Sequence, residues 1–290
     1  MADAKRALPV RGYLLHITHY DPRWYEAKEN EQPFDLDVGL AVVDAMAEAA
    51  MNLLVVDCAD GVTYASHSEL VRPYSVPMAT FEALLARANE RGIEVVPKLN
   101  FSQSGLHHHN DWFRPHNQLF DNDEYWRLAF EVIDELVEVA SPPRFFHVGM
   151  DEDHWRSYDQ YVAAIERLHA GLYDRGLRTV IWNDSACLWP QAAIHRDKSM
   201  VAEARTPRDV VQVLWDYSGA NLEILGRIRN AGFEVWGAPG RTAEMVGAMR
   251  EGVKAVGGTG LLLTQWIPCV EANRETLLAH VRTLGPLCAE

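Results

Sequence analysis

Adjacent acidic residues follow a short apolar run near the middle of the chain. The segment Arg144-Phe-Phe-His-Val-Gly-Met-Asp-Glu-Asp-His154 begins after Ser141-Pro142-Pro143, a helix-ending signal, and becomes acidic at Asp151 and Glu152. This pattern is typical of a buried strand, and a helical pattern resumes from about Ser157. Because side chains alternate along a strand, the two acids can face the same way only where the strand ends. Strand-end acids are a usual place for catalysis in barrels; a solvated turn that caps the next helix is the alternative.

The rest of the chain supplies the elements that must position these acids. Hydrophobic segments alternate with helical patterns, as buried parallel strands covered by helices do. The predicted strands are 13–18, 52–58, 93–99, the run that begins at 144, 178–184, 210–216, 233–237 and 260–266. Eight such units predict an α/β fold, a single (β/α)8 TIM barrel that forms one catalytic domain over 1–290. A doubly wound open sheet is the alternative.

Composition disfavours several classes of partner. The chain has 290 residues, of which 48% are hydrophobic and 23% charged, so it can form a full-sized core. Its net charge of −14 disfavours nucleic acid or an anionic membrane as a partner. No apolar run is long enough to span a bilayer, and the four cysteines show neither disulfide nor zinc spacing. We therefore expect a cytoplasmic protein. Its oligomeric state stays open, and a homodimer is one alternative.

In a barrel, the carboxyl end of every strand lies at one face, so the residues there should converge. Four of the later strands end in tryptophan. A single tryptophan is usually packing, but four beside acids suit a sugar site, because aromatic faces pack on pyranose C–H surfaces while polar groups bind hydroxyls. The residues predicted at this face are His16, His19, Asp57, Asp60, Lys98, Asn100, Asp151, Glu152, Trp182, Asn183, Asp184, Trp215, Asp216, Tyr217, Trp236, Gln265 and Trp266.

Three segments resemble glycoside hydrolase family 20, the β-N-acetylhexosaminidases. They are Arg91-Gly-Ile-Glu-Val-Val-Pro97, Met51-Asn-Leu-Leu-Val-Val-Asp57 with Asp60 after it, and above all His147-Val-Gly-Met-Asp-Glu152. The family carries a His-x-Gly-x-Asp-Glu motif at the end of the fourth barrel strand. The resemblance covers most of the chain as a catalytic barrel, without the accessory domain that those enzymes often have.

This resemblance implies a retaining, substrate-assisted hydrolysis in which the 2-acetamido oxygen attacks the anomeric carbon. Glu152 would be the general acid and base, and Asp151 would orient the acetamido N–H. Adjacent carboxylates suit this division, since their repulsion helps to keep one protonated. No cofactor is implied, and the expected partner is a carbohydrate. The implied or predicted substrate-binding residues are His19, Asp60, Asn100, His107, His147, Trp182, Asp184, Trp215, Tyr217, Trp236 and Trp266.

The sequence departs from the family pattern at three strand ends. The usual arginine after the first strand is replaced by His16-Ile-Thr-His19, and Pro-Glu-x-Asp becomes Pro97-Lys-Leu-Asn100. The usual Trp-x-Glu of the last strand becomes Trp266-Ile-Pro268. The residues that would hold the outer sugar hydroxyls are changed while the acid pair is kept. We therefore expect a relative with a different or modified substrate, and a catalytically inactive carbohydrate-binding barrel is an alternative.

A histidine run, His107-His108-His109, lies in the long polar loop after the third strand, with His116 nearby. It can be a solvated loop, or it can bind sugar, since the family places a histidine here to assist its acid. In a third interpretation these imidazoles bind a divalent metal for an isomerase or hydrolase acting on a sugar-like substrate, together with His147, Asp151, Glu152 or Asp184. No regular metal-ligand spacing supports that interpretation, so no metal ligand is predicted.

Overall fold

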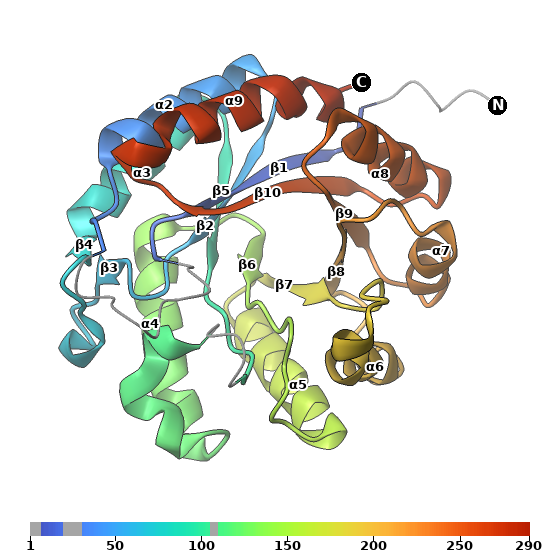
Figure 1. Cartoon of the computed structure of the whole chain (residues 1–290). Helices are drawn as coiled ribbons and strands as arrows, with labels where there is room; N and C mark the ends of the chain where they lie inside the picture. Colours follow the sequence, from blue (N-terminus) through green and yellow to red (C-terminus); the bar gives the residue numbers. More distant parts are fainter. Residues whose placement is uncertain (1–6, 20–30, 105–109) are drawn as a thin grey trace.

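The computed structural model, which describes residues 7–19, 31–104 and 110–290, contains a closed barrel of eight parallel strands (Figure 1). The order around the barrel is β1-β10-β9-β8-β7-β6-β5-β2. This confirms the predicted (β/α)8 barrel. The strands are β1 (Val10–His16), β2 (Leu53–Asp57), β5 (Glu94–Lys98), β6 (Phe145–His147), β7 (Arg178–Asn183), β8 (Val211–Asp216), β9 (Val235–Pro239) and β10 (Gly260–Pro268).

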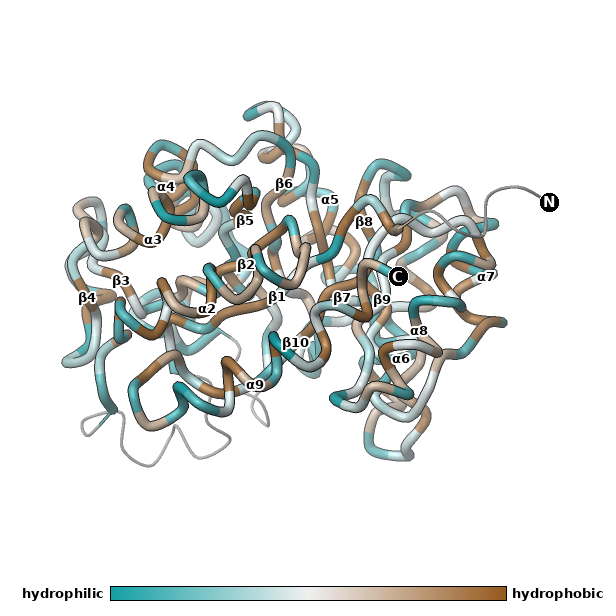
Figure 2. The backbone as a smooth tube through the Cα atoms, turned by 90° about the horizontal axis from the view of Figure 1, so that it is seen from above, coloured by the Kyte–Doolittle hydropathy of each residue, from teal (hydrophilic) through white to brown (hydrophobic). Residues whose placement is uncertain are grey.

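Helices surround the strands, and α2 and α9 contact each other where β1 pairs with β10 to close the barrel. The helices are α2 (Leu36–Glu48), α3 (Met78–Glu90), α4 (Asp123–Ala140), α5 (Tyr158–Asp174), α6 (Ala193–Ala202), α7 (Leu222–Asn230), α8 (Ala243–Ala255) and α9 (Arg274–Leu284). They mix hydrophilic and hydrophobic residues, as surface helices do (Figure 2). Within the described ranges, no helix is both long and apolar enough to cross a membrane.

The strands are buried on both faces, which explains their continuous hydrophobic runs. One apolar cluster fills the barrel interior and includes Leu14, Val55, Val96 and Val213. A second, larger cluster lies between the strands and the helices. Alternation therefore turns every second strand residue inward, including the polar ones at the carboxyl ends.

Capping side chains fix where the helices begin. Ser157 accepts a hydrogen bond from Gln160 N, and the Gln160 side chain accepts one from Ser157 N, so α5 begins with a capping box. The side chain of Asn122 likewise caps the start of α4 by accepting from Tyr125 N. The helix expected from about Ser157 is confirmed, and its start holds the chain just beyond the acid pair.

Short elements interrupt two of the connections. Between β2 and α3 lie β3 (Val62–Thr63), η2 (Ser68–Leu70) and β4 (Val76–Pro77). The loop expected after the third strand contains the 3-10 helix η3 (Asp111–Leu119). The first strand also begins earlier than expected, at Val10, because Arg11 and Gly12 obscure its apolar pattern.

Strand β9 lies two residues further along the chain than the expected 233–237. Glycine and proline are depleted in strands, so Gly237 and Pro239 made its second half read as a turn. A Cβ on Gly237 would lie 2.5 Å from the Met249 side chain, so a small residue is needed where α8 approaches the strand. The shift moves every side chain of this strand along the barrel.

This shift corrects the position of Trp236, which we expected at the mouth as a substrate-binding residue. Trp236 is the second residue of β9, at its amino-terminal end, and is fully buried. Its indole N–H donates to Glu234 and Thr259, at 3.1 Å each, and its ring packs against Phe145. The prediction is wrong because Trp236 fills the opposite end of the barrel.

Candidate active site

The acid pair lies where β6 ends and the backbone turns left-handed. Strand β6 stops at His147, and φ is +71° at Gly149, +73° at Met150 and +51° at Glu152. Non-glycine residues rarely adopt this conformation, and such strain is concentrated at functional sites. Because the strand ends before Asp151, its side chain and that of Glu152 need not point to opposite faces of the sheet. Asp151 is buried, whereas Glu152 is half-buried.

Asn100, just beyond β5, fixes this turn from the neighbouring strand. Its Nδ2 donates to Asp151 Oδ1 at 2.7 Å. Its Oδ1 accepts from Met150 N at 3.2 Å and from Ser102 N at 3.0 Å, which defines the orientation of the amide. The amide side of Asn100 therefore faces Asp151 and holds one of its oxygens.

Gly149 is required by the close approach of Asn100. A Cβ at position 149 would lie 2.2 Å from Asn100 Oδ1 and 2.8 Å from its Cα. We expect Gly149→Ala to destabilise the fold by roughly 2–5 kcal/mol, from left-handed strain and overpacking together, and to displace Asp151. Urea unfolding and catalytic assays would measure both effects.

Gly176→Ala is the matched control for this substitution. Its φ is +72°, and nothing lies within 4 Å of an added Cβ, so it should cost only the backbone strain, about 1–2 kcal/mol. Equal losses of stability in the two variants would contradict a role for the Asn100 contact.

Asp184, just beyond β7, holds the other acid. Its Oδ2 accepts from Glu152 N at 2.8 Å, and its Oδ1 accepts from Trp215 Nε1 at 2.7 Å. Burial raises the pKa of Asp184 well above its ordinary value, and the negative charge of Asp151 raises it further. Asp184 thus links the backbone of Glu152 to the aromatic wall.

Asp184→Asn tests this link through its dependence on pH. An amide can accept only one of the two N–H groups, so the variant should be less stable by about 1–3 kcal/mol at pH 5. The raised pKa means that the folded wild type binds a proton that the unfolded chain releases above about pH 4. The contribution of Asp184 to the free energy of unfolding of the wild type should therefore fall as pH rises. The difference in unfolding free energy between wild type and variant should narrow by pH 8.

Urea unfolding at both pH values would measure this gap, with Asp159→Asn as a control because its side chain is exposed. A gap that stays constant from pH 5 to pH 8 would show that Asp184 does not titrate in that range.

Aromatic side chains continue the site on the far side of Asp184. The Trp215 and Tyr217 ring centroids are 5.3 Å apart, and Trp266 Nε1 donates to the Tyr217 hydroxyl at 2.6 Å. That hydroxyl also lies 3.1 Å from Thr264 Oγ1. If Thr264 is the donor of this pair, the single proton of the phenol remains for a bound ligand. Trp215 and Trp266 are half-buried and can present ring faces to a sugar.

Trp182 supports this wall from within the barrel. It is 1% exposed, and its ring lies 5.9 Å from Trp266 and 4.7 Å from His147, between centroids. His147 is buried as well, and burial lowers its pKa well below the ordinary value, with a further contribution from the charge of Lys98. Since Gly149 N donates to His147 Nδ1 at 3.0 Å, the neutral ring carries its proton on Nε2. His147 therefore braces the turn that carries the acids.

A buried ionic group lies on the neighbouring strands. Lys98 Nζ is 2.7 Å from Asp57 Oδ2, and His16 Nδ1 is 3.2 Å from the same oxygen. Burial alone would raise the pKa of Asp57, but the Lys98 ammonium and the His16 ring lower it to about 2. Lys98, which replaces the glutamate of the family pattern, thus neutralises a buried carboxylate inside the barrel.

Two predicted substrate-binding residues have other described partners. His19 Nδ1 is 2.8 Å from Glu31, and its Nε2 is 2.6 Å from Gln32 O. Asp60 is fully buried and accepts from Thr18 and Arg72. These contacts join the segments after β1 and β2. The predicted sugar-binding His107 lies outside the described residues.

The sequence analysis missed Trp189, in a segment that it read as irregular. This side chain is 43% exposed, and its ring centroid lies 5.5 Å from that of Trp215. Arg241, also missed, lies with its guanidinium 5.3 Å from the Tyr217 ring. An aromatic residue shortly after a strand-end acid was the available signal for Trp189; no comparable signal marked Arg241, which follows β9.

Metal-ligand geometry occurs elsewhere. Within the described ranges, His67, Glu69 and His116 form a group that could hold a metal ion, because their ligand atoms all lie within 4.8 Å of one another. The acid pair does not belong to it. The histidines 107–109 of the metal interpretation lie outside the described residues.

No family model matches the chain, and no curated protein matches its sequence. Its fold matches solved structures over 98% of the chain. These include the family 20 β-N-acetylhexosaminidase of Streptomyces coelicolor (TM-score 0.71, 16% identity), the N-acetyl-β-hexosaminidase of Streptomyces plicatus (0.70, 15%) and the chitobiase of Flavobacterium johnsoniae (0.67, 15%). The match spans 64% of each Streptomyces chain and 48% of the Flavobacterium chain. The family resemblance is confirmed at the level of the fold.

Proposed function

We propose that this chain is a divergent member of glycoside hydrolase family 20 that removes a terminal β-linked 2-acetamido sugar with retention of configuration. The observation that carries the proposal is the acid pair at the end of the fourth barrel strand, with Asp151 held by Asn100 and Glu152 held by Asp184. The fold match to enzymes of this family supports it. One of the matched structures holds N-acetylglucosamine as product.

In the proposed first step, the acetamido carbonyl oxygen of the substrate attacks its own anomeric carbon. The glycosidic C–O bond breaks, and the leaving oxygen takes a proton from Glu152. The product of this step is a cyclic oxazolinium ion, whose N–H donates to the Asp151 carboxylate. Fixed negative charge in a buried site stabilises a developing cation without reorganisation, and this is the proposed role of Asp151.

In the second step, Glu152 acts as a base on water, which attacks the anomeric carbon and opens the oxazolinium ring. The acetamido group is restored, and Glu152 regains its proton. Two inversions at one carbon give net retention. The Tyr217 hydroxyl is the proposed donor to the acetamido oxygen, and Trp215 and Trp266 are the proposed walls around its methyl group.

A screen of aryl β-glycosides with and without the 2-acetamido group tests this proposal. We expect turnover of the 2-acetamido sugars alone, because the nucleophile belongs to the substrate. Turnover of 2-hydroxy glycosides at equal rates would contradict the mechanism. No turnover, together with saccharide binding by calorimetry, would identify an inactive carbohydrate-binding barrel, the alternative that the changed residues at three strand ends permit.

A further inference from the structure

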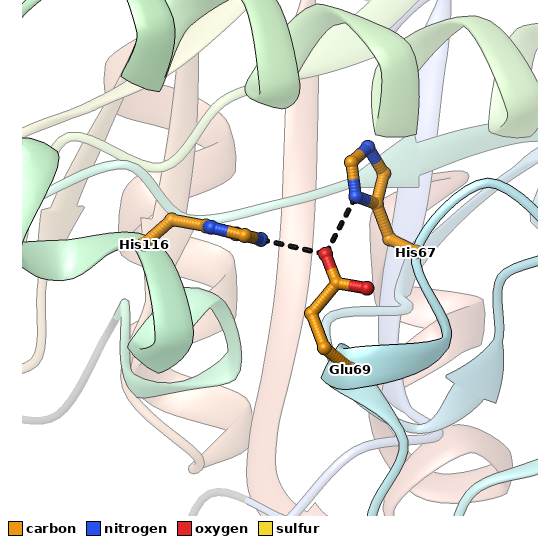
Figure 3. Close-up of side chains that lie close together, drawn as sticks. All are labelled: His67, Glu69 and His116. Carbon is orange, nitrogen blue, oxygen red and sulfur yellow. Dashed lines mark hydrogen bonds and ion pairs between the residues drawn. The ribbon is translucent and has the colours of Figure 1, made fainter.

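Two histidines and a glutamate converge in the segments that follow β3 and β5 (Figure 3). Glu69, in η2, places its Oε1 2.8 Å from His67 Nδ1 and 2.8 Å from His116 Nε2, which belongs to η3. The His67 and His116 side chains are largely buried, at 5% and 13% exposed, whereas Glu69 is 42% exposed. Their ligand atoms lie within 4.8 Å of one another.

This donor set is one that zinc prefers. Two imidazole nitrogens and a carboxylate oxygen, with a fourth position left to water, form a common tetrahedral zinc site. Ligand atoms around a tetrahedral zinc ion are roughly 3.4 Å apart, as Zn–N and Zn–O bonds near 2.1 Å require. The present contacts are shorter by about half an ångström, so the carboxylate of Glu69 must withdraw slightly to admit an ion. Its exposure on a short helix allows that movement.

A second carboxylate supports the same interpretation independently. Glu131, on α4, places its Oε2 3.1 Å from His67 Nε2. Histidines that bind metals commonly donate their other ring N–H to a carboxylate, which fixes the tautomer and directs the lone pair at the ion. Here the proton on Nε2 would face Glu131 and leave Nδ1 free for the metal.

The surrounding contacts hold the two histidines in place. Glu135 accepts from Ala65 N at 2.7 Å and from Ser66 N at 2.9 Å, so α4 fixes the backbone just before His67. The buried Phe113 ring lies 4.8 Å from the His116 ring. Such support is needed for a site to exist before the ion arrives.

We propose that His67, Glu69 and His116 bind one divalent transition-metal ion, zinc by its donor set, which joins η2 to η3. The ion serves to hold η3 in place. In that helix, Trp112 Nε1 donates to the carbonyl oxygen of Asn100 at 2.8 Å, and Asn100 binds Asp151. The ion would therefore help to position Asp151 through Trp112 and Asn100. That effect on catalysis rests on the proposed function, whereas metal binding itself does not.

Calorimetric titration of ZnCl2 into the full chain, stripped with a chelator and dialysed, tests the site. We expect one zinc ion per chain and a rise in Tm on adding zinc. Glu69→Gln and His116→Asn should each weaken binding at least about 10-fold and abolish the rise in Tm. MgCl2 should not replace zinc, because imidazole is a poor ligand for magnesium.

His169→Asn is the matched control, since His169 contacts one carboxylate, Asp209, at 2.8 Å, and should bind zinc like the wild type. The proposal is overturned if no heat of zinc binding is seen, or if Glu69→Gln and His116→Asn bind zinc unchanged. It is also overturned if replacing His107, His108 and His109 removes the binding while those two variants keep it. None of these measurements depends on glycosidase activity.

Discussion

Glu152→Gln is expected to lower kcat on 2-acetamido glycosides by about 10²–10⁴-fold while leaving Tm nearly unchanged. The substitution removes the proton that the leaving oxygen needs but keeps the size of the side chain. The bond from Glu152 to Asp184 is made by its backbone N–H, which the variant retains. Kinetic assays at saturating substrate and a thermal unfolding curve would measure the two effects.

The dependence on the leaving group separates this role from general damage. Dinitrophenolate leaves without protonation, so the variant should recover most of its first-step rate on dinitrophenyl glycosides and remain slow on sugar leaving groups. Glu166→Gln, on the surface of α5, is the control with wild-type kinetics. An equal loss of rate for all leaving groups would argue against Glu152 as the acid.

The sequence predicted the barrel because its strands are buried on both faces. Runs such as Leu53–Asp57 have no polar residue before their end, so the sequence predicts both the strand and the position of its carboxyl end. The same reasoning located Asp151 and Glu152 at the end of the fourth strand and the start of α5 near Ser157. These features depend on local pattern and on the equivalence of strand ends in a barrel.

The partners of the acids could not be predicted in this way. Asn100 and Asp184 were recognised as strand-end residues, but their bonds to Asp151 and Glu152 join positions 51 and 32 residues apart. The left-handed backbone at Met150 and Glu152 was hidden as well, because neither residue type favours it. Both features arise from packing between neighbouring strands.

The structure explains two of the residues that differ from the family pattern, Lys98 and Asn100. Lys98 pairs with Asp57 inside the barrel and so does not project toward a substrate. Asn100 donates to Asp151, where an aspartate would instead place a second negative charge. The two substitutions thus affect the charge beneath and beside the acid pair. Under the proposed function, Trp189 beside Trp215 offers a surface on which a further sugar can stack.

Asp151→Asn is expected to lower kcat/KM on 2-acetamido glycosides by about 10²–10³-fold, the usual effect of removing one group that stabilises transition-state charge. Asn100 already donates to Oδ1 of Asp151, so the amide of the variant would keep its oxygen there and turn its NH2 group toward the substrate N–H. That arrangement opposes two donors and removes the negative charge that stabilises the oxazolinium ion. Steady-state kinetics on matched glycosides would measure the loss.

The same variant distinguishes the substrate-assisted mechanism from one with an enzyme nucleophile. If Asp151 attacked the anomeric carbon itself, Asp151→Asn would abolish turnover, and a 2-fluoro sugar would leave a covalent adduct on Asp151 of the wild type, detectable by mass spectrometry. If the acetamido group attacks, no adduct forms, and an oxazoline-like thiazoline inhibitor should bind the wild type more tightly than the variant. Since adjacent acids at one strand end are compatible with either chemistry, the adduct experiment decides which bond Asp151 makes.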